Sequence, residues 1–380
     1  MSEGVTLLIM TGVEGVSDPE AMLNRSLEAN TLDLLKKTGS IPAVERQLLI
    51  TNSPSLLSQD FTDYPGLEVI NSGDEFHFGN ELFSKIDEYD VKNLFYLGGG
   101  SGPLFREEDL AGIVNFIQEK DNVSLANNFY STDMIGFTPA TSLLELDPPE
   151  KDNELGWLTR EAELKPFEMK RCAKTELDLD TPADLLPIKL SGLPPGELSE
   201  HVSGLSWGGA RIREILPQFT DQESRLVIAG RVGAATWSKL EKSAACHVDV
   251  LSEGRGSYGR ATGGNRSYLT GKLFEEYGPE GFLQVLLDKG TGLFLDTRVL
   301  FDFLGEWPSR KDRFASDLLQ PEGVATGYLN KLTRAAAAAE KPVVLGGHST
   351  ISGALYLLAD SAWNLVEPKS VNIRPKTFTL

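Results

Sequence analysis

Strand-like and helix-like segments alternate through the first 190 residues, and this order restricts the fold more than any other feature of the chain. Short apolar runs of strand length lie at residues 5–10, 46–52, 67–72 and 93–100. Segments with apolar residues spaced three and four apart lie at residues 20–37, 80–89 and 106–120. This alternation predicts an α/β fold with a mostly parallel, Rossmann-like sheet and helices on both of its faces.

A second α/β pattern follows a stretch rich in Pro and Gly at residues 186–204. We expect a first domain over 1–190, a linker over 191–204 and a second α/β domain over 205–380. In the second domain, strands are expected at 224–230, 246–254 and 341–347, and helices at 235–244, 267–290, 295–305, 326–340 and 349–366. The sequence of the second domain resembles no family that we recognise.

The chain is strongly acidic, with 36 Lys and Arg against 55 Asp and Glu and a formal net charge of −19. This charge repels phosphate backbones and anionic membranes, so neither a nucleic acid nor a membrane is an expected partner. No apolar stretch reaches the ~18–20 residues that span a bilayer, no signal peptide is evident, and there are two cysteines. A cytoplasmic protein is expected, and a homo-oligomer is left open.

One short element in the first domain carries a family resemblance. The segment LDLDTPADLLPIKL (177–190) resembles the closing element of the molybdenum-cofactor and phospholactate guanylyltransferases, within the GT-A-like nucleotidyltransferases. Residues 93–114 are similar to the central strand, turn and helix start of that family, and residues 156–166 add a weaker likeness. The resemblance implies a nucleotidyltransferase-like domain that binds a nucleotide or phosphorylated small molecule and uses Mg²⁺.

Asp178 and Asp180 are the expected catalytic and metal-binding residues. They lie two apart, so in an extended segment they face the same side, and Mg²⁺ in proteins needs one or two such carboxylates. A second interpretation needs no metal. Thr181 or Asp180 can cap a helix with Pro182 at its first position.

The expected nucleotide-binding residues come from the strand ends: Gly12, Gly15, Gly98, Gly99, Gly100, Asn127 and Asn128. Glycines allow a phosphate to approach the backbone closely. However, Glu14 and Asp18 stand where the resembled family has cations, and none of the three glycines at 98–100 can bind a metal as that family's Asp does. A catalytically silent binding or assembly module is therefore the alternative function, with any activity in the second domain. The region 126–140 also reads as a plain strand and turn.

An anion site is expected in the second domain. Arg255, Arg260 and Arg266 lie in a loop with five glycines, and His348, Ser349 and Thr350 follow a predicted strand at a helix start. Arginine side chains and free amides at helix N-termini both favour phosphate or carboxylate. The alternatives are a flexible surface loop and a simple helix cap by Ser349 or Thr350.

Two further segments, 293–300 and 307–319, mix Asp and Arg residues. We expect surface ion pairs there, with a ligand cleft as the less favoured interpretation. Zinc is not expected, because the His and Cys residues lack paired ligand spacing.

Overall fold

A computed structural model of the chain describes residues 3–64, 66–73, 75–205, 209–254 and 268–366. The chain forms two compact units. Unit 1 comprises Met1–Glu14, Asn24–Leu179 and Leu193–His201, and unit 2 comprises Gly15–Leu23, Asp180–Gly192 and Val202–Leu380. Both short segments 15–23 and 180–192 therefore belong to the second unit rather than to the first.

Unit 1 contains a seven-stranded sheet in the order β3-β2-β1-β4-β6-β5-β7. Its strands are β1 (Val5–Thr11), β2 (Val44–Thr51), β3 (Leu67–Asn71), β4 (Asn93–Gly98), β5 (Val123–Ala126), β6 (Met134–Thr138) and β7 (Lys165–Glu168). Strand β6 is antiparallel to both of its neighbours, and the other pairings are parallel.

Alternate residues of β1 supply two separate hydrophobic cores, one on each face of this sheet. Leu7 and Ile9 pack with α1 (Asp18–Gly39) and α4 (Glu107–Glu119). Leu8 and Met10 pack with α3 (Phe78–Glu88), α5 (Leu155–Glu161) and the 3₁₀ helix η1 (Ala140–Glu145). Strands that are buried on both faces are usually nearly continuous apolar runs, and β1 is such a run apart from Thr6 and Thr11.

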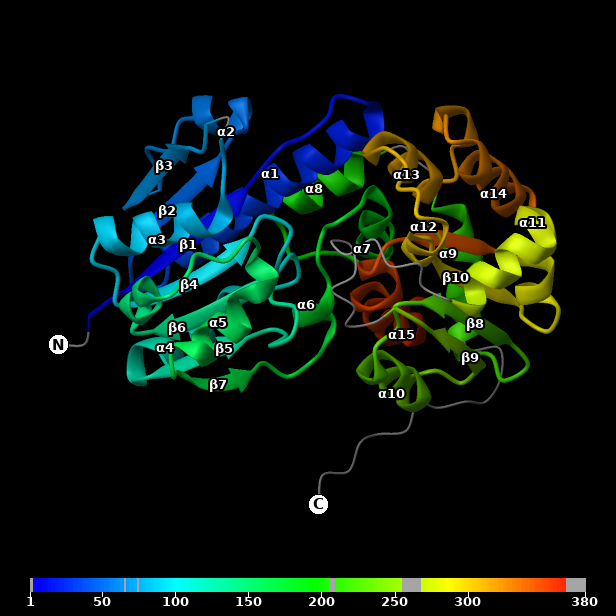
Figure 1. The fold of residues 1–380 in the computed structure, drawn as a ribbon. Coiled ribbons are helices and arrows are strands. Elements are labelled where there is room, and N and C mark those ends of the chain that lie inside the picture. Colours follow the sequence, from blue (N-terminus) through cyan, green and yellow to red (C-terminus); the bar gives the residue numbers. More distant parts are fainter. Residues whose placement is uncertain (1–2, 65, 74, 206–208, 255–267, 367–380) are drawn as a thin grey trace, which may run out of the picture. The chain divides into compact units, whose positions relative to one another are not determined.

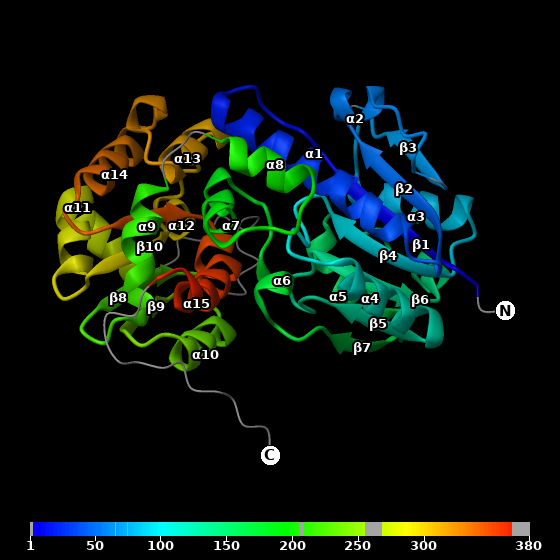
Figure 2. The ribbon, with the colours of Figure 1, turned by 180° about the vertical axis from the view of Figure 1, so that it is seen from behind.

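Short elements complete unit 1: α2 (Pro54–Ser58), η2 (Asp152–Glu154) and α6 (Ala173–Glu176). The ribbon views show the helix layers on the two sides of the sheet (Figures 1 and 2).

Unit 2 contains a four-stranded parallel sheet in the order β11-β10-β8-β9. Its strands are β8 (Arg225–Gly230), β9 (His247–Ser252), β10 (Gly292–Asp296) and β11 (Val343–Gly346). One face packs against α11 (Leu269–Leu287), α12 (Arg298–Leu304), α13 (Arg310–Asp317) and α14 (Gly327–Ala338). The other face packs against α7 (Leu185–Ser191), α9 (Ala210–Ile215), α10 (Ala234–Ser243) and α15 (Gly353–Leu365).

The 3₁₀ helices of unit 2 are η3 (Pro182–Asp184), η4 (Leu216–Thr220), η5 (Pro321–Gly323) and η6 (Ser349–Ile351). The predicted fold class is confirmed, because a mostly parallel sheet with helices on both faces is joined to a second α/β unit.

Two local elements were not expected from the sequence. The helix expected around 295–305 is confirmed as α12, but the strand β10 (Gly292–Asp296) directly before it was missed. The segment 191–204, expected as a linker, contains all of α8 (Glu197–Gly204). The carboxylate of Asp33 accepts hydrogen bonds from the first two backbone amides of α8, at 2.8 and 3.1 Å, and so stabilises a helix start that the local sequence alone did not indicate.

Among the described residues, none of the helices combines the length and the apolar character that a bilayer span requires.

Candidate functional site

The first candidate site lies at the carboxyl ends of β1 and β4 in unit 1. Strands β2 and β3 lie on one side of β1, and β4 lies on the other, so the strand order reverses between β1 and β4. In open α/β sheets, ligands bind outside the carboxyl ends of the strands at such a reversal. Gly12 leaves β1 at this point, and Gly99 leaves β4.

The turn after β4 is packed so tightly that it requires glycine. A Cβ added to Gly99 would lie 2.1 Å from Oγ1 of Thr11, and one added to Gly100 would lie 2.9 Å from the carbonyl oxygen of Leu179. The buried amide of Asn30 on α1 donates to the carbonyl oxygens of Gly99 and Ser101, each at 2.9 Å. Close packing therefore explains two of the three glycines without a ligand.

A carboxylate lies beside this turn even though none follows β4 in the sequence. Ser101 and Asp178 form an isolated antiparallel bridge, and the amide of Leu179 donates to the carbonyl oxygen of Gly100 at 3.0 Å. Oγ of Ser101 lies 3.1 Å from Oδ1 of Asp178. The fold thus brings Asp178 to the end of β4 from a position 77 residues later in the chain.

Two more carboxylates lie near the same strand end. The hydroxyl of Tyr96 donates to Oδ2 of Asp152 at 3.1 Å, and the side chain of Asn153 donates to Oδ1 of Asp133 at 3.2 Å. Burial, and then the negative charge of nearby Asp152, Asp133 and Asp178, raises the pKa of Tyr96 well above its ordinary value. This phenol therefore stays protonated and acts as a hydrogen-bond donor among acidic groups.

The metal-binding capacity of this region is limited. Within the part of the chain that the structure describes, no three His, Cys, Asp or Glu side chains are grouped closely enough to hold a metal ion. Mg²⁺ usually keeps several waters and takes one or two protein carboxylates together with substrate phosphates. The half-buried Asp178 at the strand end fits that requirement.

The two carboxylates expected to share a metal belong to different units. The division of the chain falls between Leu179 and Asp180, with Asp178 in unit 1 and Asp180 in unit 2. The exposed Asp180 acts electrostatically on Asp184 and Arg231. The capping interpretation is confirmed, because Thr181 is the N-cap of η3 and Pro182 is its first residue.

The two asparagines expected to bind a nucleotide differ in their free capacity. Oδ1 of Asn127 accepts from the amides of Asp133 and Met134, and its Nδ2 donates to Oδ2 of Asp133 and to the carbonyl oxygen of Thr175, at 3.1–3.3 Å. Asn127 therefore holds the loop between β5 and β6. Oδ1 of Asn128 accepts two hydrogen bonds as well, but its Nδ2 has none to the described residues.

The loop after β1 carries the remaining predicted glycines. Gly12 is exposed, and a Cβ added there would lie 3.6 Å from its nearest neighbour, Oδ1 of Asn52. Gly15 has φ +75° and belongs to unit 2. Glu14 is exposed, and the side chain of Asn24 donates to its carbonyl oxygen at 3.2 Å. The nucleotide-binding role of these residues stays a prediction.

A second candidate site lies at the carboxyl ends of β8 and β10 in unit 2. The strand order reverses there too, because β9 lies on one side of β8 and β10 lies on the other. Nε and Nη2 of Arg231, which follows β8, lie 2.6 and 3.2 Å from the two carboxylate oxygens of Asp296 at the end of β10. Gly230 has φ +130°, and an added Cβ would lie 2.4 Å from Cβ of Asp296. The glycine thus allows the two strand ends to approach each other.

A second ion pair continues from Asp296 into the interior. Nη1 and Nη2 of Arg298 each lie 2.7 Å from an oxygen of Asp317, and both side chains are buried. Nη1 also donates to Oγ1 of Thr297 at 2.9 Å and to the carbonyl oxygen of Gly346 at 3.0 Å. The expectation of surface ion pairs is therefore wrong for Arg298 and Asp317. These residues lie on α12 and α13, whose packing buries the pair.

A buried carboxyl group lies next to the predicted anion-binding residues. Oγ1 of Thr350 lies 3.1 Å from Oδ1 of Asp184, whose Oδ2 accepts from the amide of Thr181 at 2.8 Å. Burial, and then the nearby charge of Asp180, raises the pKa of Asp184 to about 8. At neutral pH this carboxyl group is therefore mostly protonated.

The predicted anion-binding residues lie in three kinds of environment. Ser349 and Thr350 begin η6, and both are buried, so their side chains face the interior rather than a surface. His348 is half-buried and acts electrostatically on Asp296. The three loop arginines, Arg255, Arg260 and Arg266, lie outside the described residues.

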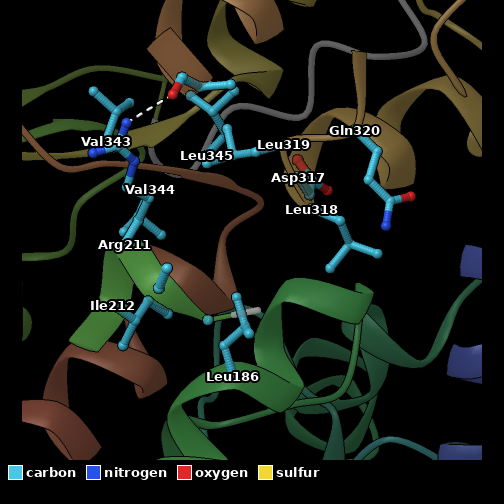
Figure 3. Close-up of a pocket in the computed structure, with 13 residues that line it drawn as sticks. Leu186, Arg211, Ile212, Asp317, Leu318, Leu319, Gln320, Val343, Val344 and Leu345 are labelled. Atoms are coloured by element: carbon cyan, nitrogen blue, oxygen red, sulfur yellow. Dashed lines mark hydrogen bonds between the residues drawn. The ribbon is translucent and has the colours of Figure 1, made fainter. Parts of the chain in front are cut away.

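A cavity of about 260 Å³ lies beside the edge strand β11 of unit 2. Figure 3 shows the apolar side chains of Leu186, Ile212 and Leu318 around it. Arg211 on its wall donates to the carbonyl oxygens of Ala337 and Ala339, at 2.7 and 2.8 Å, and Asp317 is paired with Arg298. Its charged wall residues thus already have partners, and its free surface is mainly apolar.

Comparison with known proteins gives structural matches of low sequence identity and low TM-score. No family model matches the chain, and no curated protein sequence matches it. A cytidylyltransferase from Leptospira borgpetersenii is similar over 49% of this chain and 85% of its own, with 18% identity and a TM-score of 0.36. The structure of CMP:2-keto-3-deoxy-manno-octonic acid synthetase complexed with CTP is similar over 44% of this chain and 90% of its own, with 10% identity and a TM-score of 0.31.

A third match is 4-diphosphocytidyl-2C-methyl-D-erythritol synthase from Anaerococcus prevotii, over 44% of this chain and 87% of its own, with 8% identity and a TM-score of 0.29. The first match is named as a cytidylyltransferase, and none of the three is named as a molybdenum-cofactor or phospholactate guanylyltransferase. These values are too low to assign an activity to the chain.

Proposed function

We propose that unit 1 binds a nucleotide or a phosphorylated small molecule at the carboxyl ends of β1 and β4, and that it transfers a nucleotidyl group with the help of Mg²⁺. The observation that carries this proposal is the bridge between Ser101 and Asp178. It places a carboxylate beside the turn after β4, where three glycines leave the sequence without one. The resemblance of residues 177–190 to the closing element of guanylyltransferases supports the same residue.

In this proposal Asp178 would hold Mg²⁺, which would supply positive charge to the nucleotide phosphates. An oxygen of the acceptor attacks the α-phosphorus, the bond to the leaving pyrophosphate breaks, and the proton of the acceptor leaves to water. Gly12 lies in an open part of the first loop, so its backbone can approach a phosphate. The free Nδ2 of Asn128 is a donor for the nucleotide or the acceptor.

A second function is favoured by one specific feature of the same site. In the loop after β1, the exposed Glu14 stands where phosphate binding calls for a cation. Three carboxylates also surround Tyr96, so the site is acidic before any metal binds. A binding module that lacks transferase activity would keep the ligand site and need no Mg²⁺ for its role.

Equilibrium binding of each of the four ribonucleoside triphosphates, with and without Mg²⁺, separates the two functions. We expect binding that depends on Mg²⁺, and we expect Asp178→Asn to weaken it by about tenfold or more through loss of a charged metal ligand. Asp121→Asn is the matched control, because this exposed carboxylate precedes β5, at the end of the sheet opposite the carboxyl end of β4.

Two results would count against the transferase, and a third would change which residues bind the metal. Binding that ignores Mg²⁺, with no release of pyrophosphate, favours the binding module. No binding of any triphosphate by the folded protein rejects both functions. An effect of Asp180→Asn equal to that of Asp178→Asn would assign both carboxylates to the metal.

A further inference from the structure

We propose that unit 2 carries a separate site for an oxyanion, the phosphate or carboxylate group of a small molecule, and that Arg231 is the residue that binds it. The site lies at the carboxyl ends of β8 and β10, where the order of the second sheet reverses. It shares no described residue with the proposed nucleotide site of unit 1.

Arg231 is held in place by one edge of its guanidinium group only. Nε and Nη2 bind the carboxylate of Asp296, which has no exposed surface. Nη1 has no hydrogen bond to any described residue, and 18% of the Arg231 side chain is exposed. A planar guanidinium fixed on one edge presents its other donors in a defined direction, which suits two oxygens of one anion.

The buried partner gives Arg231 its rigidity. Asp296 also accepts a hydrogen bond from the backbone amide of Arg298 at 3.1 Å, and the charge of Arg231 holds the pKa of Asp296 below its ordinary value despite burial. Asp296 therefore stays ionised over the whole neutral range. An arginine positioned by a buried, permanently charged carboxylate loses little further conformational freedom when it binds a ligand.

The neighbouring charged groups leave Arg231 as the better placed arginine of the two at this strand end. Arg298 is buried, and its Nη1 and Nη2 bind Asp317, Thr297 and the carbonyl oxygen of Gly346. Asp184 is mostly protonated at neutral pH and adds little negative charge. Asp180 is exposed and acts electrostatically on Arg231, but no hydrogen bond joins the two side chains. A ligand oxyanion would therefore compete with Asp180 for the positive charge of Arg231, but it would not have to break a hydrogen bond between them.

Helix α10 adds a second source of donors. It starts at Ala234, three residues after Arg231, and its N-cap Gly233 supplies no side-chain hydrogen bond. The first amides of this ten-residue helix therefore have no cap from their own N-cap side chain, and the helix dipole favours negative charge at that end. Arg231 and the helix start lie on one short loop, so both can serve the same anion.

This site lies next to part of the anion site expected from the sequence, which stays a prediction. Ser349 and Thr350 face the interior, whereas His348 acts on Asp296 and belongs to the same cluster. Arg231 itself was missed, although a cation directly after an apolar strand, in VIAGRVG (227–233), was a visible signal.

Calorimetric titration of the full chain with inorganic phosphate, and separately with succinate, tests the proposal and distinguishes the two anions. We expect one of the two to bind, and we expect Arg231→Gln to weaken that binding by about 10- to 100-fold, the loss of a charge-assisted pair. Arg231→Lys keeps the charge beside Asp296 but removes the fork, so it should weaken binding while the protein stays folded by circular dichroism. Asp180→Asn should strengthen binding, because it removes a competing negative charge.

Arg225→Gln is the matched control, since Arg225 lies at the opposite end of β8 and makes an exposed pair with Asp249. It should leave anion binding unchanged. The proposal is overturned if the wild-type protein binds neither anion, or if folded Arg231→Lys binds the anion as tightly as the wild type. If Arg231 binds no anion, Mg²⁺-dependent triphosphate binding at Asp178 is still expected. The two proposals can therefore be rejected separately.

Discussion

The carboxyl ends of the two sheets have the same topological feature but are stabilised by different interactions. In unit 1, the turn after β4 packs closely against Thr11 and receives neutral hydrogen bonds from Asn30. In unit 2, the ion pair of Arg231 with Asp296 joins the ends of β8 and β10, and the buried pair of Arg298 with Asp317 joins α12 to α13. We therefore expect the stability of unit 1 to depend most on side-chain volume at the turn after β4. The stability of unit 2 should depend most on charge at the ends of its strands.

The largest expected effect is removal of a buried charge partner in unit 2. Arg298→Ala leaves the carboxylate of Asp317 inside the protein without its guanidinium, and breaking a buried pair in this way costs about 3–5 kcal/mol. Unfolding by urea, followed by circular dichroism, measures this cost. Arg225→Ala breaks the exposed pair with Asp249 and should cost about 1 kcal/mol or less. Equal costs for the two variants would show that burial of the pair does not matter.

The next effect tests the role of volume in unit 1. Gly99→Ala forces a methyl group against the Thr11 side chain, and overpacking of this kind costs about 1–3 kcal/mol. Gly12→Ala adds the same methyl group where the nearest atom is 3.6 Å away, so its cost should stay within about 0.5 kcal/mol. The comparison is informative because both glycines leave strands at the same reversal point. A Gly99→Ala variant as stable as Gly12→Ala would mean that the turn can relax.

The last effect concerns the pH dependence of unit 2. The pKa of Asp184 is raised to about 8 in the folded state, against about 3.9 in an unfolded chain. The folded state therefore keeps a proton that the unfolded state releases, and its stabilising contribution is complete below pH ~4 and is lost as the pH rises toward about 8. The slope is at most about 1.4 kcal/mol per pH unit.

Asp184→Asn cannot titrate, so the variant should lack this component of the slope. The measurement is the free energy of unfolding of both proteins at several pH values between 4 and 8. Identical pH profiles for the wild type and Asp184→Asn would show that this carboxyl group is ionised in the folded protein.

Sequence patterns predicted β1, β2, β3 and β4 because each contains an apolar run of strand length. Strands β5 and β7, of four residues each, were missed. Strand β10 was missed for a physical reason. Its apolar part is short, and the equally apolar residues of α12 follow within two positions, so period and length could not separate strand from helix. The helix α8 was missed because its capping carboxylate, Asp33, lies 164 residues earlier in the chain.

The candidate sites were predictable to different degrees. The glycines of unit 1 and Asp178 were visible as local motifs, although the bridge that joins Asp178 to Ser101 was not. In unit 2, Arg231 and Asp296 are 65 residues apart, and their pairing depends on β8 and β10 being neighbours. No local pattern contains that information. Charged residues that the sequence suggested as surface pairs therefore include three that are buried, Asp296, Arg298 and Asp317.

The central claim is that the carboxyl ends of the two sheets are separate ligand sites. Measuring both kinds of binding on both site variants tests this claim most directly. Mg²⁺-dependent triphosphate binding and phosphate or succinate binding are measured on the wild type, Asp178→Asn and Arg231→Lys. The account predicts that Asp178→Asn weakens only the Mg²⁺-dependent binding and that Arg231→Lys weakens only the anion binding. A variant that weakens both to the same extent, or two folded variants that weaken neither, would contradict it.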